Sequence, residues 1–382
     1  MGSRVLIVRL GALGDLVHMV PAVAAIRAAW PDARIDWLVD ARYATLLSFV
    51  SGFDRAIVIG HSSRASVDPN SGSVSPGGLN ALAARNNVAA GRPSVAPVSG
   101  TRSDDRVFPG GPSGVWRAVR FLRAQSYDVA LDAQGLIKSA LLARASGARR
   151  VIGFAAQFLR EPAAQVCYTE TAVPERGVHV VRKNLALVRA LGIDPGALRF
   201  PITAPFDPEL ARALPAPGPD GQLRFAILNP GAGWPNKRWR PERFGAVAGH
   251  LRDRHGLLSV VTWGPGEQAL ADAVVRASDG SARSAPATNL GGLIAVIERA
   301  TLFVAGDTGP LQIAAALGTP IVALFGPTDP ARNGPWSLSD VSLSRFDQCD
   351  CHHKRRCRRS SACIDDITID EVLRAVDRRL EA

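Results

Sequence analysis

The stretch that most constrains the fold is residues 5–21, VLIVRLGALGDLVHMVP. It begins with four apolar residues typical of a buried strand and turns through Gly11 and Gly14. Apolar side chains then recur every three or four positions up to Trp30, which is the period of one helix face. This order predicts the opening of a doubly wound α/β domain, whose ligands bind beyond the carboxyl ends of the strands. Asp15 lies at this point, where a carboxylate can stabilise a helix start or act as a general base toward a cleft.

The same alternation of strand and helix patterns runs through both halves of the chain. In the first half we predict strands at residues 34–39, 56–59, 129–131 and 150–154, and helices at 115–125 and 179–191. In the second half we predict strands at residues 225–228, 258–262, 302–305 and 321–325, and helices from 241 and at 293–300, 310–317 and 369–380. Repeated βα units form parallel sheets. The predicted fold class is therefore α/β, with two Rossmann-like domains facing a cleft.

Composition separates these two domains from two segments of different character. Residues 60–113 are rich in Gly, Ser, Pro and Asn, and such a segment buries too little apolar surface to offset its ordering entropy. We predict a disordered insertion there, with a mobile flap over an acceptor site as the alternative. Residues 205–222 contain five prolines and are the predicted linker. The domains are then residues 1–204 and 223–382, and we expect the terminal helix to pack back across their boundary.

The charge balance points to anionic partners. The 382 residues include 45 Lys and Arg against 34 Asp and Glu, a net charge of +11. The basic residues are spread along the chain apart from residues 354–359, and no nucleic-acid-binding signature accompanies them, so we expect no nucleic-acid partner. No run of 18 apolar residues and no signal-peptide pattern is present, so we expect a cytoplasmic protein.

Eight short motifs occur in a consistent order across both halves. They are residues 9–21 (RLGALGDLVHMVP), 132–139 (DAQGLIKS), 160–162 (REP), 229–233 (NPGAG), 237–239 (KRW), 263–267 (WGPGE), 307–310 (DTGP) and 325–330 (FGPTDP). As an ordered set they resemble the lipopolysaccharide heptosyltransferases, which are ADP-heptose glycosyltransferases, and within that family chiefly heptosyltransferase I. The resemblance implies the glycosyltransferase-B architecture, an ADP-heptose donor, an acidic glycolipid acceptor and a peripheral position at the inner face of the cytoplasmic membrane.

The donor side is expected on the second domain. Asp307 follows an apolar strand and precedes a helix, where backbone N–H groups and the helix dipole suit a diphosphate, although an ordinary N-cap has the same pattern. Like charges repel, so Asp307 is expected to orient the loop or a neighbouring lysine. The resemblance implies that a glutamate after the 263–267 turn accepts ribose hydroxyls. The predicted donor-binding residues are Gly231, Gly233, Glu267, Asp307, Thr308, Gly309 and Gln312.

Two residues are predicted to be catalytic. The resemblance implies that Asp15 removes the proton from the acceptor hydroxyl, and that Lys237 neutralises charge as the sugar–phosphate bond breaks. Arg238 and Arg240 are nearby substitutes for the lysine, which is otherwise an ordinary solvated loop residue. No cofactor or catalytic metal is required by this scheme, because the lysine and the helix dipole act where a magnesium ion would.

The acceptor side is expected on the first domain. Lys138 and Arg160 could bind a sugar carboxylate, the arginine in bidentate fashion, or could simply lie on a helix and a loop surface. His18 lies one turn after Asp15 and is predicted to line the cleft, because no nucleophile motif accompanies it. The predicted acceptor-binding residues are Gly14, His18, Gln134, Lys138, Arg160 and Glu161.

Four cysteines lie close together near the end of the chain. Cys349, Cys351, Cys357 and Cys363 accompany two histidines in the spacing C-x-C-x5-C-x5-C, which is not a common zinc pattern. Reducing surroundings disfavour disulfides, and four thiols could hold a structural zinc or iron ion. Such a site is expected to be remote from the reaction.

The predicted function is an inverting transfer of heptose from ADP-heptose to the 3-deoxy-octulosonic acid of the lipopolysaccharide inner core. A heptosyltransferase with a protein acceptor would use the same chemistry. A dinucleotide dehydrogenase would use Gly11, Gly14 and Asp36 or Asp40, but the spacing fails the G-x-G-x-x-G fingerprint. A non-catalytic sugar-nucleotide-binding protein is a third alternative, because Gln312 stands where the family usually places a histidine.

Overall fold

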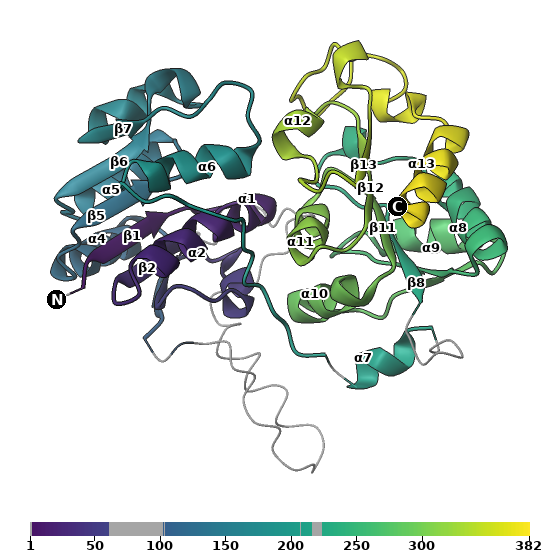
Figure 1. Ribbon diagram of the computed structural model, residues 1–382, viewed down its shortest axis with the longest axis horizontal. Helices are drawn as coiled ribbons and strands as arrows, with labels where there is room; N and C mark the ends of the chain where they lie inside the picture. The colour runs from purple at the N-terminus through teal and green to yellow at the C-terminus, as the bar shows by residue number, and fades with distance from the viewer. Residues whose placement is uncertain (1, 61–101, 103, 207, 216–223) are drawn as a thin grey trace. The chain divides into compact units, whose positions relative to one another are not determined.

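The computed structural model describes residues 2–60, 102, 104–206, 208–215 and 224–382 (Figure 1). The chain divides into two compact units, the first ending at Ile202 and the second beginning at Thr203. Each unit is built on its own parallel sheet flanked by helices. The predicted α/β class with two Rossmann-like domains is confirmed.

The first unit holds a seven-stranded parallel sheet in the order β4-β3-β2-β1-β5-β6-β7. Its strands are β1 Arg4–Val8, β2 Arg34–Asp40, β3 Arg55–Ile59, β4 Arg106–Phe108, β5 Val129–Asp132, β6 Arg150–Phe154 and β7 Glu170–Ala172. Its helices are α1 Leu13–Val17, α2 Val20–Ala29, α4 Pro112–Ala124, α5 Ile137–Ala145 and α6 Val180–Arg189. Leu6 and Val8 of β1 pack with Leu122 of α4 and Ala143 of α5, which places the core between sheet and helices.

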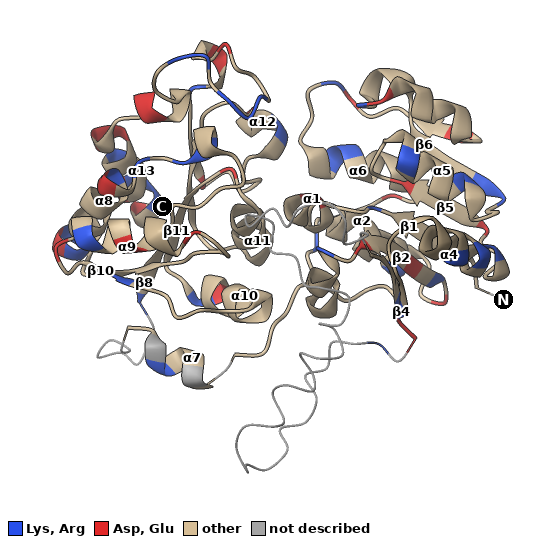
Figure 2. Ribbon diagram, turned by 180° about the vertical axis from the view of Figure 1, so that it is seen from behind, with Lys and Arg blue, Asp and Glu red and all other residues tan. Residues whose placement is uncertain are grey.

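The second unit holds a six-stranded parallel sheet in the order β10-β9-β8-β11-β12-β13. Its strands are β8 Phe225–Asn229, β9 Leu258–Val261, β10 Ala282–Ser284, β11 Leu302–Gly306, β12 Ile321–Phe325 and β13 Val341–Ser344. Its helices are α7 Pro208–Ala213, α8 Pro241–His255, α9 Gln268–Ala277, α10 Leu290–Arg299, α11 Gly309–Leu317, α12 Pro330–Asn333 and α13 Ile369–Glu381. The central strands β8 and β11 carry no charged residue, as Figure 2 shows, because both their faces are covered.

Local chemistry sets the helix ends around the second sheet. Pro241 opens α8, and Gly256 ends it with φ +64°, a left-handed conformation that favours glycine. The Thr368 side chain accepts a bond from Glu371 N, and the Glu371 side chain accepts one from Thr368 N, which forms a capping box at the start of α13.

Three sequence-based expectations differ from the structure. The apolar period of residues 16–30 predicted one helix, but the chain forms α1 and α2 separately, with His18 ending the first. Within the predicted insertion 60–113, residues 106–108 form β4 on the edge of the sheet, and α4 begins at Pro112. Residues 61–101 and 103, on which the rest of that expectation rests, lie outside the described residues.

The predicted linker also differs from the structure, and the terminal helix packs within the second unit. Part of the predicted linker 205–222 forms α7, whose buried Leu210 lies near Gly292 of α10. Helix α13 packs on α8, β12 and β13 of its own unit, where Val372 and Val376 are fully buried. The apolar face of α13 is therefore buried inside the second unit, and its packing across the domain boundary stays a prediction.

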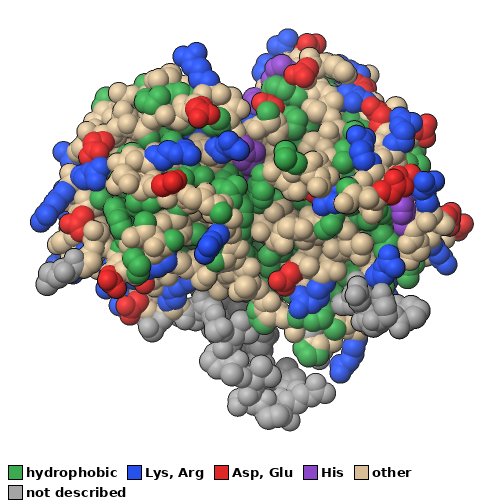
Figure 3. Space-filling model, in the orientation of Figure 1, with side chains coloured by type: hydrophobic (Ala, Val, Ile, Leu, Met, Phe, Trp, Pro, Cys, Tyr) green, Lys and Arg blue, Asp and Glu red, His purple; other side chains and the backbone are tan. Residues whose placement is uncertain are grey.

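The surface is mixed in charge. On the face seen in Figure 3, Lys and Arg side chains are scattered among Asp and Glu rather than gathered in one patch. In the part of the chain that the structure describes, no helix combines the length and the apolar character needed to cross a membrane.

Candidate active site

The first part of the candidate site lies where the strand order of the first sheet reverses. β1 and β5 are neighbours, and the chain continues from β1 to one side of the sheet and from β5 to the other. The loops after these strands are joined, because Leu10 N donates to Gln134 Oε1 at 2.9 Å and the Arg9 guanidinium donates to the Ala133 carbonyl. Ligands of open α/β sheets bind at such a reversal, so these loops form a natural binding edge.

Asp15 is held in place by its own loop. Its Oδ2 accepts a hydrogen bond from Ala12 N at 3.1 Å and pairs with Arg9 Nη2 at 2.8 Å. The arginine side chain is 9% exposed and the Asp15 side chain 37%, so the pair presents a carboxylate with a fixed orientation toward solvent. Gly14, the preceding residue, is half-buried in the first turn of α1.

His18 is buried rather than open to solvent. It is 3% exposed, and its ring lies edge-on to that of His179, with 5.4 Å between the ring centroids. The Asn184 side-chain amide donates to the His18 carbonyl at 3.0 Å. These contacts tie the end of α1 to α6.

The other predicted acceptor residues follow β5 and β6. Glu161 Oε2 accepts a hydrogen bond from Ile137 N at 2.8 Å, which brings the loop after β6 against the start of α5. The neighbouring Lys138 and Arg160 are exposed. The structure therefore gathers Gln134, Lys138, Arg160 and Glu161 at one edge of the sheet, where Glu161 also caps a helix start.

A buried carboxyl that motif reasoning left without a role supports this edge. Asp132, at the end of β5, accepts hydrogen bonds from Gln134 N, Gly135 N, Ser139 Oγ and Tyr168 Oη. Burial raises the pKa of Asp132 even though these bonds favour its charged form. Its contacts fix the turn that carries Gln134 and Lys138.

The second part of the candidate site lies where the strand order of the second sheet reverses, between β8 and β11. Lys237 follows β8 in a short 3₁₀ helix, Pro235–Lys237, and its Nζ lies 2.5 Å from Asp307 Oδ2 after β11. Their side chains are 14% and 9% exposed. A Cβ at Gly306 would lie 2.6 Å from the Lys237 carbonyl oxygen, so only glycine allows β11 to approach this loop. In this geometry the Asp307 carboxylate fixes the position of the Lys237 ammonium.

Thr308 begins α11 directly beside this pair. Its hydroxyl accepts a hydrogen bond from Leu311 N at 3.3 Å, and Gly309 and Pro310 occupy the first helical positions. The N-terminus of α11 and the Lys237 ammonium therefore lie together at the carboxyl ends of β8 and β11, an arrangement suited to a phosphate group.

Glu267 packs against the glycine-rich turn after β8. Its Oε2 accepts a hydrogen bond from Gly264 N at 3.1 Å, and its Oε1 lies 3.6 Å from Arg238 Nη2. A Cβ at Gly231 would overlap this carboxylate, which explains the glycine there, whereas Gly233 is exposed. Glu267 thus belongs to the same edge of the sheet as Lys237.

Gln312 has an internal partner. It is 3% exposed, and its Nε2 donates to the Asn333 carbonyl at 2.8 Å, which joins α11 to the end of α12. The structure therefore uses this amide to hold two helices of the same unit together.

Sequence reasoning missed two neighbours of Lys237. The Trp234 ring lies 4.4 Å from Lys237 Nζ, a cation–π contact, and the buried Asn236 donates from Nδ2 to the Lys354 carbonyl at 2.8 Å. Both residues lie within three positions of the lysine, but their orientation depends on segments more than 100 residues away.

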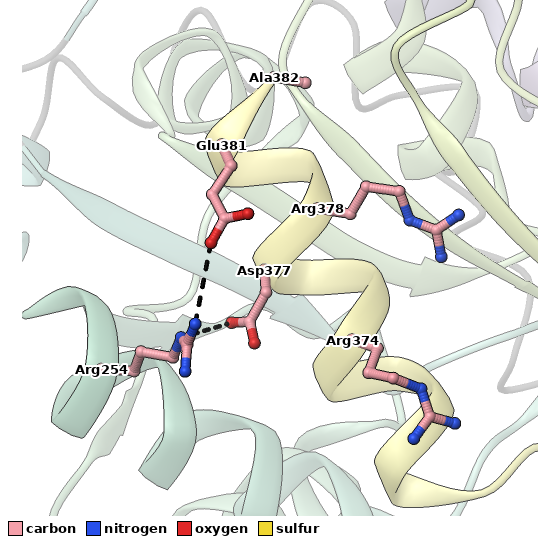
Figure 4. A pocket seen from close by; sticks show the side chains of 6 residues that line it. All are labelled: Arg254, Arg374, Asp377, Arg378, Glu381 and Ala382. Atoms are coloured by element: carbon pink, nitrogen blue, oxygen red, sulfur yellow. Dashed lines mark ion pairs between the residues drawn. The ribbon is translucent and has the colours of Figure 1, made fainter.

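A surface pocket lies apart from these motifs (Figure 4). It is formed by α8 and α13 and lined by Arg254, Arg374, Asp377, Arg378, Glu381 and Ala382. Arg254 lies 3.4 Å from Asp377 and 3.8 Å from Glu381, so part of its positive charge is neutralised. None of the residues predicted from the motifs lines this pocket.

Comparison with known protein families identifies the kind of protein that has these two groups of candidate site residues. The model of glycosyltransferase family 9 (heptosyltransferase) matches residues 115–362. The chain belongs to this family. It is therefore a glycosyltransferase, and this membership excludes the alternative of a dinucleotide dehydrogenase.

Relatives and solved structures agree with this membership. Lipopolysaccharide heptosyltransferase 1 of Pseudomonas aeruginosa is 28% identical over 356 residues, which cover 93% of this chain and 87% of that protein. The family 9 glycosyltransferase of Veillonella parvula has a TM-score of 0.73 at 19% identity, covering 99% of this chain and 97% of the other. The E. coli heptosyltransferase WaaC, solved with ADP-2-deoxy-2-fluoro heptose, has a TM-score of 0.65 at 23% identity, covering 98% and 99%. These structures share the fold of this chain.

Proposed function

We propose that the protein transfers heptose from ADP-heptose to the 3-deoxy-octulosonic acid of the lipopolysaccharide inner core, with inversion at the anomeric carbon. Family membership supports glycosyl transfer. The names of the relatives support heptose as the sugar, and the ADP-heptose analogue bound by WaaC supports the donor class. The observation that carries the proposal is the Lys237–Asp307 pair beside the start of α11.

The proposed reaction is a single displacement. Asp15 takes the proton from an acceptor hydroxyl as its oxygen attacks the anomeric carbon. The bond from that carbon to the diphosphate oxygen breaks, and ADP leaves with the electron pair. Lys237 and the Thr308–Gly309 helix start stabilise the negative charge that develops on the diphosphate.

The ion pair explains how the donor side can be ready before the substrate arrives. Lys237 and Asp307 are mostly buried, and the aspartate holds the ammonium in one position. An incoming diphosphate would share that ammonium with Asp307 and accept backbone N–H bonds from the start of α11. Such preorganised charge costs little rearrangement at the moment of reaction.

On the acceptor side, we propose that Lys138 and Arg160 bind the carboxylate of an acidic sugar. Both are exposed beside Gln134 and Glu161, and an arginine can hold a carboxylate in bidentate fashion. The net charge of +11 suits an acidic glycolipid, and we propose a peripheral association with the inner face of the cytoplasmic membrane.

Mass spectrometry of reaction products tests this proposal. The protein is incubated with ADP-heptose and, separately, with a lipid A acceptor carrying 3-deoxy-octulosonic acid, a protein acceptor, or no acceptor. We expect a heptose-sized mass gain on the glycolipid and release of ADP. A gain only on protein would identify a protein-directed heptosyltransferase, and ADP-heptose binding without any product would identify a non-catalytic relative.

A further inference from the structure

The cysteine-bearing segment near the end of the chain brings its thiols together. Cys349, Cys351 and Cys363 are 3%, 1% and 0% exposed, and their three sulfur atoms lie within 4.8 Å of one another. Cys351 Sγ lies 2.7 Å from Cys349 Sγ, 3.5 Å from Cys357 Sγ and 3.9 Å from Cys363 Sγ. The cysteines come from irregular segments and a short 3₁₀ helix after β13, and Cys357, which is half-buried, packs against the other three.

These separations are close to those of a tetrahedral thiolate site. Zinc–sulfur bonds of about 2.3 Å place the sulfurs of a tetrahedron about 3.8 Å apart. The 3.5 and 3.9 Å distances from Cys351 lie near this value, and the Cys349–Cys351 distance must widen by about 1 Å. Four sulfur ligands in tetrahedral geometry are typical of zinc or iron.

We propose that Cys349, Cys351, Cys357 and Cys363 bind one zinc or iron ion, and that this metal site positions the loop that carries Lys237. The metal site stands without the proposed function, whereas the consequence for catalysis rests on it.

The charges around the cluster suit four thiolates. Four thiolates and a divalent ion carry a net charge of −2, and the run Lys354-Arg355-Arg356-Cys357-Arg358-Arg359 supplies five cationic side chains beside them. The ligands of such an ion are thiolates, so the neighbouring cationic side chains would offset their charge.

The cluster is attached to the loop that carries Lys237, although such a site was expected to be remote from the reaction. Lys354, between Cys351 and Cys357, accepts the hydrogen bond from Asn236 Nδ2. A Cβ at Gly326 would lie 3.2 Å from both Cys363 Sγ and the Asn236 carbonyl oxygen, so the cluster and the loop meet across this glycine. Asn236 immediately precedes Lys237, so a change in the cluster is transmitted through one residue.

Further contacts join the two segments on either side of this bond. The Arg355 guanidinium lies 6.0 Å from the centroid of the Trp234 ring, against which Lys237 Nζ also lies at 4.4 Å. Arg240 pairs with Asp365 at 3.4 Å, two residues after Cys363. Closing the cysteine segment around a metal would therefore restrain the loop at both of its ends.

Elemental analysis of the full chain, purified without chelator, tests the metal site. We expect about one zinc or iron ion per chain, and the two elements are measured separately. Cys351→Ser and Cys363→Ser should lose the metal, whereas Cys167→Ser, a cysteine of the first unit, should keep it. A total of zinc and iron below about a tenth of an equivalent per chain would overturn the proposal. A Cys349–Cys351 disulfide in the peptide map would overturn it as well.

Hydrogen exchange tests the positioning role without any measurement of activity. Chelation of the wild-type protein avoids variants that fail to fold. We expect residues 234–238 to exchange at least about tenfold faster after metal loss, while β1 of the first unit is unchanged. Asn236→Ala should reproduce the faster exchange with the metal still bound. Metal loss without any change in residues 234–238 would reject the positioning role even if the metal site is real.

Discussion

The two units use the same parallel α/β architecture but build their candidate sites differently. In the first unit, Asp15 lies half-buried in the first turn of α1 and is paired with Arg9 of the preceding loop, and Lys138 and Arg160 are exposed. In the second unit, Lys237 and Asp307 are mostly buried and come from loops 70 residues apart. We propose that the first edge receives the acceptor and that the second receives the compact diphosphate of the donor.

The proposed function accounts for this difference. An exposed carboxylate can accept a proton from a bulky substrate that arrives from solvent. A buried ammonium held by a carboxylate and placed beside a helix start stabilises charge most strongly, because water does not screen it. The predictions below test whether the two edges carry these separate duties.

The largest effect is expected at the first edge. Asp15→Asn should lower turnover by about 10²–10⁴-fold while ADP binding persists, since it removes the proposed base without changing the donor side. Steady-state kinetics and calorimetric ADP titration measure the two effects. Asp104→Asn, an exposed carboxylate of the same unit, is the matched control and should retain wild-type turnover. Normal turnover in Asp15→Asn would remove the base assignment.

Lys237→Ala should lower turnover by about 10²–10³-fold, the scale of one charge-stabilising group. Asp307→Asn should cost less, because it leaves the ammonium in place but loosens its position. If the two residues act as a unit, the double variant should lose little more than Lys237→Ala alone. Additive losses would show that Asp307 has a separate role, such as contact with the donor.

A third prediction compares an ion pair in each unit by its effect on stability. Hydrogen bonds from Arg345, and to a smaller extent from Thr368, lower the pKa of Glu371 from its usual 4.5 to about 2. The Arg345 side chain is 15% exposed and the Glu371 side chain 29%. Because the pKa is lowered on folding, the stabilisation is complete above about pH 4.5 and is lost as the pH falls toward 2. Glu371→Gln should therefore cost about 1–2 kcal/mol at pH 7, and the difference from wild type should vanish near pH 2.

The control for that prediction is Glu170→Gln in the first unit. Glu170 pairs with Arg150 at 2.7 Å, but both side chains are 40% exposed or more, so solvent screens the pair. Its loss should change the free energy of unfolding by no more than about 0.5 kcal/mol. Chemical denaturation across the pH range measures both variants, and equal losses would contradict the role assigned to burial.

A smaller effect is expected at Gln312. Its amide is used between α11 and α12, so Gln312→His should change turnover by less than about tenfold, or ~1.4 kcal/mol. A large rise in turnover from an almost inactive parent would instead identify the natural protein as a degenerate transferase. Kinetics with ADP-heptose separates the two outcomes.

The smallest effect is expected from shortening the predicted insertion. Deleting residues 64–98 should leave the melting temperature and turnover nearly unchanged, because loop-closure entropy varies slowly with loop length. Deletion of residues 64–108 should be harmful, since β4 pairs with β3, Arg102 Nη2 donates to the Val50 carbonyl at 2.6 Å, and Asp105 accepts from Ala56 N. Loss of acceptor turnover at an unchanged melting temperature in the shorter deletion would support a flap.

Much of this protein is determined locally by the sequence. The strands at residues 150–154 and 321–325 have the bounds that their apolar runs predicted, because a strand covered on both faces must be continuously apolar. Asp15 follows β1 and Thr308 begins α11, because glycine turns and capping residues act within a few positions. The edge strands β4, β7, β10 and β13 were not predicted, since short and partly exposed strands lack a strong apolar pattern.

Only the tertiary structure decided which of these local features meet. The motifs contained Lys237 and Asp307, but their pairing depends on β8 and β11 lying side by side. The four cysteines raised the possibility of a metal site, but only the structure shows three of their sulfurs together and the bond from Asn236 to Lys354. It also shows that Gln312 bonds to Asn333. Periodicity and capping act over a few residues, whereas these contacts depend on how separate βα units pack, and a single sequence carries no local signal of that packing.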